Sequence, residues 1–189
     1  MRDADSPSDE TLLRRYADGD AQAAQLLLDR MTPRLYRLAL RLLADAAEAE
    51  DVVQEAMLRL WQIAPRWEPG AAQPATWAYR VAMNLATDRL RRRRSVPLDA
   101  VPEPADEAPA PFEALLETDR TRALEAALAQ LPDRQRQAVV LRHLEGLPNP
   151  EIADVMGVGV EAVESLTARG KKRLADLLSG RREDLGYET

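Results

Sequence analysis

The sequence predicts an all-α protein with two small helical domains joined by an acidic Pro/Ala-rich linker. Helix-forming Ala, Leu, Arg and Glu dominate the 189 residues, whereas aromatic residues make up only 4% of them. Apolar side chains recur every three or four residues on both sides of residues 95–113. That segment, SVPLDAVPEPADEAPAPFE, has five prolines and neither Lys nor Arg, so it is predicted to be extended.

Composition and charge exclude several classes of protein. Cysteine is absent and His143, predicted to be a surface or boundary residue, is the single histidine, so no metal centre or cofactor is expected. No apolar run approaches the roughly 20 residues of a membrane span, and the polar start MRDADSPSDE is not a signal peptide. A cytoplasmic protein without membrane insertion is expected. The net charge is −6, and the negative charge is concentrated in residues 95–119, which hold seven acids and no bases.

The first domain is predicted to span residues 1–94 and to contain four helices. Ser8 or Asp9 is expected to cap the first, which ends near residues 17–20, and the second extends to about Met31. Thr32 and Pro33 have the pattern of an N-cap followed by proline at the first helical position. A third helix is therefore predicted to begin there and to continue past residue 45.

The part of this helix after Asp45 has a buried face and an acidic face. Asp45 and Glu48 have capping-box spacing. One apolar stripe contains Ala49, Val52, Val53, Ala56, Met57, Leu60 and Trp61, and the opposite face contains Glu48, Asp51, Glu55, Leu58 and Gln62. An acidic face with an exposed leucine is either a solvated surface or a docking surface for a basic partner.

Residues 65–77, PRWEPGAAQPATW, form a predicted loop with two tryptophans, which either anchor the loop or contact a ligand. In the helix that follows, Trp77, Val81 and Leu85 are predicted to point inward, Tyr79, Met83 and Ala86 to point away, and Arg80 and Asn84 to lie on the flank.

An arginine cluster ends this helix: Arg89, Arg91, Arg92, Arg93 and Arg94. One or two arginines would suffice to pair with the helix dipole, so five favour contact with phosphate. Aromatic rings beside a basic run are typical of proteins that bind single-stranded nucleic acid.

The second domain, predicted over residues 112–189 after a linker at 95–111, is expected to end in a helix-turn-helix. Pro132 opens a helix with core candidates Val139, Val140, Leu144 and Leu147, and Asn149 is expected to cap the next helix. Ala153 is the small residue where two helices cross, Gly157 lies in the turn, and Ile152, Met156, Val158, Val163 and Leu166 occupy the apolar positions. An ordinary αα-hairpin is the alternative. The outward residues of the last helix are Glu161, Ser165, Ala168, Arg169 and Lys172.

These segments occur in the order found in bacterial extracytoplasmic-function (ECF) sigma factors, which the chain resembles from about Leu12 to Leu178. The most specific stretches are YRLALRLLADAAEAEDVVQEAMLRLW and WAYRVAMNLATDRLRRR. The resemblance implies a sigma region 2-like first domain and a region 4-like second domain. It implies that the protein binds core RNA polymerase and directs promoter-specific initiation by reading −10 and −35 elements.

The resemblance also assigns the candidate sites. Docking on the β′ clamp helices would use Asp51, Gln54, Glu55, Leu58 and Gln62. Reading and melting of the −10 element would use Trp67, Trp77, Tyr79, Arg80, Met83, Asn84, Arg89, Arg91, Arg92 and Arg93. Reading of the −35 duplex would use Glu161, Glu164, Ser165, Ala168, Arg169 and Lys172.

Partners follow from the same resemblance: core polymerase through the β′ clamp helices and the β flap, promoter DNA, and an anti-sigma factor. Because polymerase supplies affinity and two joined readers raise each other's effective concentration, the recognition helix can be nearly neutral. Glu164 stands where many members have a basic residue. It either accepts a hydrogen bond from cytosine N4 or is an acid favoured by the helix dipole.

Two other classes of function compete with this interpretation. A stand-alone helix-turn-helix transcriptional regulator would leave the EDVVQE helix, the tryptophan loop and the arginine cluster unexplained. An enzyme is disfavoured because the sequence has no nucleophile–base pair, glycine-rich phosphate loop or metal cluster.

Overall fold

The computed structural model describes residues 6–68, 70, 72–95 and 112–179, and all of its regular elements there are helical. The first domain contains α1 (Asp9–Ala17), α2 (Ala21–Leu43), α3 (Ala46–Ile63), the 3₁₀ turn η1 (Ala64–Arg66) and α4 (Pro74–Ser95). The second contains α5 (Phe112–Ala129), α6 (Asp133–Val139), the π-helical η2 (Val140–Leu144), α7 (Asn149–Met156) and α8 (Val160–Ser179). The predicted all-α fold is confirmed. The predicted linker at 95–111 lies almost wholly outside the described residues, so the predicted domain boundaries stay predictions.

The α2 helix is longer than the sequence predicts. It is one helix from Ala21 to Leu43 that contains Pro33, so the expected boundary at Thr32 and Pro33 is wrong. An interior proline costs about 3 kcal/mol or more. The stripe that continues through it buries Leu27, Met31, Leu35, Leu38 and Leu42, each at about 1.5–3 kcal/mol, which exceeds that cost.

The real boundary falls between α2 and α3. Ala44 has a left-handed backbone with φ of 53°, which ends α2. The side chain of Asp45 then accepts a hydrogen bond from the Glu48 amide at 2.9 Å and caps α3. The expected helix through residue 45 is therefore two helices that pack against each other. Ser8 caps α1 and accepts from the Thr11 amide, as predicted.

The first domain encloses its core between α1, α2, α3 and α4. The predicted stripe of α3 is buried except for Trp61, whose ring lies 4.4 Å from that of Tyr16. This leaves the opposite face of α3 toward solvent.

The helix-turn-helix of the second domain matches the predicted geometry. Ile152, Ala153, Met156 and Val163 are buried, and Gly157 ends α7 with φ of 63°. Asn149 is the first residue of α7 and not its cap, because Pro148 holds the extended conformation that precedes the helix. At Gly170, an added Cβ would lie 2.6 Å from Val139 Cγ2, so α8 approaches α6 closely.

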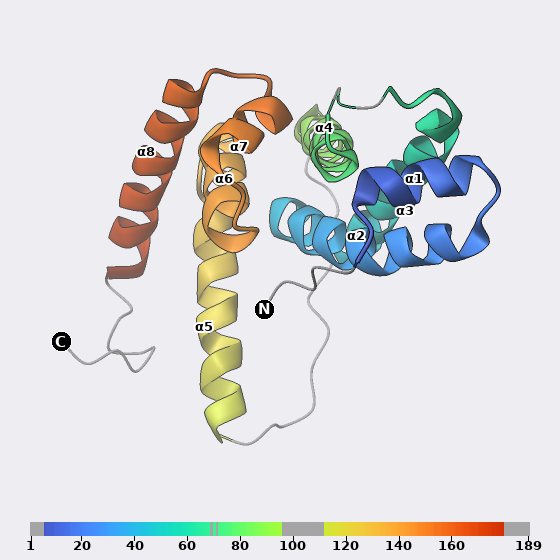
Figure 1. Cartoon of the computed structure of the whole chain (residues 1–189). Helices are drawn as coiled ribbons and strands as arrows, with labels where there is room; N and C mark the ends of the chain where they lie inside the picture. Colours follow the sequence, from blue (N-terminus) through green and yellow to red (C-terminus); the bar gives the residue numbers. More distant parts are fainter. Residues whose placement is uncertain (1–5, 69, 71, 96–111, 180–189) are drawn as a thin grey trace.

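The two domains are packed together, with α4 between the rest of the first domain and α7 (Figure 1). The α2 helix also touches α5 and η2. The buried apolar residues of the two domains form one continuous cluster. Across the described ranges, no helix has the length and apolar character needed to cross a membrane.

Candidate functional site

The outward face of α3 is an open acidic surface. Asp51, Gln54 and Gln62 are exposed, and Leu58 is 56% exposed. Glu55 is half-buried and accepts a 2.9 Å hydrogen bond from Arg59 one helical turn away. The sequence prediction of an acidic face with an exposed leucine is therefore confirmed as geometry.

The predicted loop 65–77 is shorter than expected, because η1 includes Pro65 and Arg66 and α4 begins at Pro74. Trp67 follows η1 and Trp77 lies in the first turn of α4, and their side chains pack against each other. The rings of Trp67 and Trp77 meet edge to face with centroids 6.1 Å apart, and both are half-buried against the core. Glu10 of α1 accepts a 3.2 Å hydrogen bond from the Gly70 amide in this segment. These contacts support the prediction that the tryptophans anchor the loop.

The α4 helix departs from the prediction. Tyr79 and Met83 are 5% and 3% exposed and Ala86 is fully buried, so the expectation that they point away into solvent is wrong. The reason is that α4 has two partners, since α2 and α3 pack on one side and α7 packs on another. Arg80 and Asn84 are exposed, as expected for flank positions.

Arg80 binds the second domain although its side chain is exposed. Its Nε donates to the Asp154 carbonyl at 2.9 Å, and Nη2 donates to the same oxygen. A backbone carbonyl of α7 therefore binds the Arg80 side chain, which was predicted to contact DNA.

The arginine cluster serves the fold as well as the surface. Arg93 donates to the Leu43 carbonyl at 2.9 Å and to the carboxylates of Asp45 and Glu48 at 3.1 Å, which ties the end of α4 to the α2–α3 turn. Arg91 pairs with Asp88 within α4 at 3.0 Å. Because Arg93 donates to a carbonyl at the end of α2, it is less available to bind phosphate than the sequence predicts.

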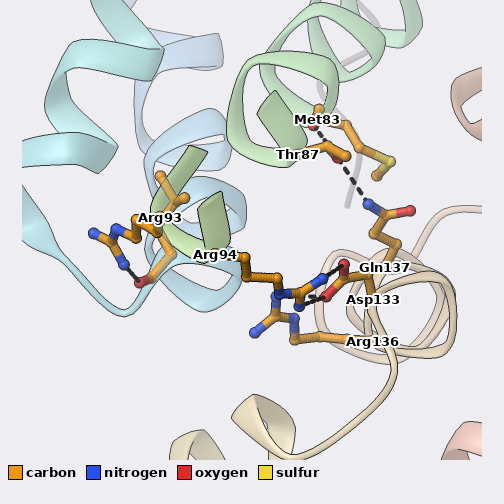
Figure 2. Close-up of polar contacts among 8 residues, drawn as sticks. Met83, Thr87, Arg93, Arg94, Asp133, Arg136 and Gln137 are labelled. Atoms are coloured by element: carbon orange, nitrogen blue, oxygen red, sulfur yellow. Dashed lines mark hydrogen bonds and ion pairs between the residues drawn. The ribbon is translucent and has the colours of Figure 1, made fainter. Parts of the chain in front are cut away.

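Arg94 and Thr87 connect α4 to α6. Arg94 forms two hydrogen bonds to the Asp133 carboxylate, at 2.8 and 2.7 Å, and Gln137 donates to the Thr87 hydroxyl at 2.9 Å (Figure 2). The Thr87 hydroxyl in turn donates to the Met83 carbonyl. The hydrogen bonds with Arg94 lower the pKa of Asp133, and burial opposes this effect.

The outward face of α8 is open. Its predicted duplex-reading residues are exposed: Glu161, Glu164, Ser165, Ala168, Arg169 and Lys172. Glu164 accepts a 3.5 Å hydrogen bond from Asn149 at the start of α7. Glu164 therefore has a hydrogen-bond partner within the helix-turn-helix.

Sequence reasoning missed an interdomain ion-pair cluster. The Glu145 side chain is 1% exposed and lies against Arg37 and Arg41 of α2 and Tyr79 of α4. No local pattern distinguishes Glu145 from a surface acid, because its partners lie far away in the sequence. His143 is exposed as predicted, and partial burial, Lys171 and Arg142 lower its pKa.

The two domains match two families. Residues 27–96 match Sigma-70 region 2, and residues 121–174 match Sigma-70 region 4. The chain is 33% identical over 174 residues to the ECF RNA polymerase sigma factor SigM of Mycobacterium tuberculosis, covering 90% of this chain and 85% of SigM. It is 36% identical over 177 residues to the ECF RNA polymerase sigma factor SigE of Mycolicibacterium smegmatis, covering 92% of this chain but only 62% of SigE.

A solved structure has the same arrangement of helices. CnrH, determined in complex with the cytosolic domain of CnrY, superposes with a TM-score of 0.71 at 26% sequence identity, covering 92% of this chain and 99% of CnrH. The protein is thus an RNA polymerase sigma factor, a class of protein that directs transcription initiation. Within that class, the chain belongs to the ECF subfamily. The match to region 2 does not favour a stand-alone helix-turn-helix regulator, which needs the second domain alone.

Proposed function

We propose that this ECF sigma factor docks on the β′ clamp helices of core RNA polymerase through the open face of α3. Asp51, Gln54, Glu55, Leu58 and Gln62 form this face. A hydrophobic side chain at the centre of acidic and amide groups suits a partner that offers a basic rim around an apolar contact. The observation that carries this proposal is the exposure of Leu58 beside acidic residues on a helix whose other face, apart from the partly buried Trp61, lies in the core.

We propose that the 65–77 segment and α4 read and melt the −10 element, and that α8 reads the −35 duplex. Exposed Asn84 can form paired hydrogen bonds to a base edge, and Arg80 lies beside it. The α8 face presents Arg169 and Lys172 for phosphates and Glu161, Glu164, Ser165 and Ala168 for base edges. The second domain is also the part expected to contact the β flap.

Regulation by an anti-sigma factor belongs to the same proposal, supported by the likeness to CnrH, which was solved with the cytosolic domain of CnrY. We further propose that the protein acts in the cytoplasm and has no enzymatic activity of its own, without a cofactor.

The test is run-off transcription with purified core polymerase on genomic fragments, followed by mapping of start sites. Promoter-specific transcripts that require the protein are expected. Failure to co-elute with core polymerase would overturn the docking proposal, because every later step depends on that contact.

A further inference from the structure

The interface between the domains contains a buried acid held by basic residues from the other domain. Glu145 Oε1 lies 2.5 Å from Arg41 Nη1, and Glu145 Oε2 lies 3.7 Å from Arg37 Nη2. The Tyr79 hydroxyl donates to the same Oε2 at 3.4 Å. Glu145 follows η2 in the second domain, whereas its three partners belong to α2 and α4. A carboxylate this buried is tolerated because these donors compensate for its lost hydration.

The basic side of this contact has more charge than one carboxylate neutralises. Arg34, Arg37 and Arg41 follow one another at helical spacing along α2. Arg34 and Tyr79 line the same small pocket, and the charge of Arg34 opposes the effect of Glu145 on the pKa of the Tyr79 hydroxyl. Burial raises that pKa first and Glu145 raises it further, so the hydroxyl remains a hydrogen-bond donor. Arg34 and Arg37 are also exposed, which leaves them accessible to a larger anion.

The same place holds residues proposed to read the −10 element. Tyr79 is both a partner of Glu145 and one of the residues proposed to read the −10 element. Arg80, the next residue, donates to the Asp154 carbonyl of α7. A DNA strand that reaches the buried side of α4 would have to displace η2 and α7. The second domain and a DNA strand therefore cannot contact this side of α4 at the same time.

We propose that the three arginines of α2 and the Tyr79 hydroxyl form a binding site for a phosphate of promoter DNA, and that Glu145 fills this site while the domains are packed together. This inference rests on the proposed function. A carboxylate and a phosphate both present anionic oxygens to guanidinium groups, so one replaces the other without new donors. In the molecules whose domains are packed together, Glu145 occupies the site, so the apparent affinity of the protein for DNA is lowered in proportion to the fraction of such molecules.

The test uses the full chain and a labelled single-stranded oligonucleotide of random sequence, because a phosphate contact does not depend on sequence. Glu145→Gln removes the internal charge, and Glu151→Gln removes an exposed charge from α7 as a matched control. Glu145→Gln is expected to bind the oligonucleotide about threefold tighter or more, since more molecules are open. Glu151→Gln should leave the affinity at the wild-type value, and unchanged affinity in Glu145→Gln would overturn the proposal.

A second variant separates a phosphate site from a simple domain contact. Arg37→Ala with Arg41→Ala also breaks the contact with Glu145, but it removes donors that DNA would use. It is expected to gain no affinity, and its plot of log affinity against log salt should be less steep by about 0.7 for one lost phosphate contact. If it instead gained as much affinity as Glu145→Gln, the arginines would only hold the domains together.

Domain separation and folding are measured in the same samples. Small-angle scattering should show a larger radius of gyration for both variants, with helicity near that of wild type. If Glu145→Gln loses helicity, the salt dependence of the arginine variant alone decides the question, because an unchanged slope excludes the phosphate contact. Run-off transcription by the wild-type protein tests the proposed function separately: active wild type with an unaffected Glu145→Gln variant overturns only this inference.

Discussion

The outward faces of α3 and α4 lie in the same domain but meet different surroundings. On α3, Asp51, Gln54 and Leu58 face solvent. On α4, Tyr79 and Met83 are buried, and the second domain contacts this helix through α6, α7 and the residue after η2. In the compact chain, the surface proposed for polymerase is thus available while part of the surface proposed for DNA is covered. This difference suits an order in which polymerase binds first and DNA binds after the domains have moved.

The largest effect is expected from reversing charge on the open face. Asp51→Arg with Glu55→Arg should abolish co-elution with core polymerase, because two like charges would meet the basic partner. Helicity and melting temperature should stay near wild type, since neither side chain contributes to the buried stripe of α3. Glu50→Arg, an exposed position outside the proposed face, serves as the control. Wild-type binding by the double variant would show that the open face is only solvated.

The second prediction concerns the packing of α8 against α6, the helix that contacts α4. In Gly170→Ala, the new Cβ would lie 2.6 Å from Val139 Cγ2 and 3.1 Å from the Gln135 carbonyl. Alanine gains about 1 kcal/mol of helix propensity, but the backbone carbonyl cannot move aside by changing a rotamer. A net loss of about 1–3 kcal/mol of unfolding free energy is expected in urea denaturation. Ala175→Ser, exposed on α8, should change it by about 0.5 kcal/mol or less. A more stable Gly170→Ala protein would show that the helices separate easily at this point.

The features of the fold and of the candidate site that could be predicted from the sequence are those that depend on contacts between residues close together in the sequence. The buried stripe of α3 and the turn at Gly157 follow from side-chain spacing within one or two helices, and both are confirmed. The boundary proposed at Pro33 was wrong because a local rule was applied where a long apolar stripe dominates. The covered face of α4 and the buried Glu145 depend on how two domains meet, which periodicity within one helix does not describe.

The third prediction concerns the part of α4 that remains exposed. Asn84→Ala should leave stability and polymerase binding nearly unchanged, because the side chain lies in solvent. It should slow open-complex formation on duplex promoters, since hydrogen bonds to a base edge no longer offset unpairing. Permanganate reactivity of thymines in the bubble measures this, and a template pre-melted across the −10 element should recover much of the loss. Equal losses on both templates would place Asn84 outside strand separation.

The smallest effect is expected from the exposed ion pair between α4 and α6. Hydrogen bonding to Arg94 holds the pKa of Asp133 below its usual value in the folded protein. A carboxyl whose folded pKa is lowered binds fewer protons than in the unfolded chain, so its contribution to stability is present above the unfolded pKa. That contribution is lost as the pH falls through the folded pKa. Asp133→Asn should therefore reduce the dependence of unfolding free energy on pH in the acidic range.

The size of this effect is limited because Arg94 is well exposed to solvent, which screens the pair. Urea denaturation between about pH 3 and pH 7 measures it, with Asp88→Asn as the control because Asp88 pairs with Arg91 inside α4. Small-angle scattering on the same samples asks whether the pair also helps to keep α4 covered. If Asp133→Asn expands the chain as far as Glu145→Gln does, the closing contact is spread over the interface. If it changes only the pH dependence, the Arg94–Asp133 pair does not help to keep the buried face of α4 covered.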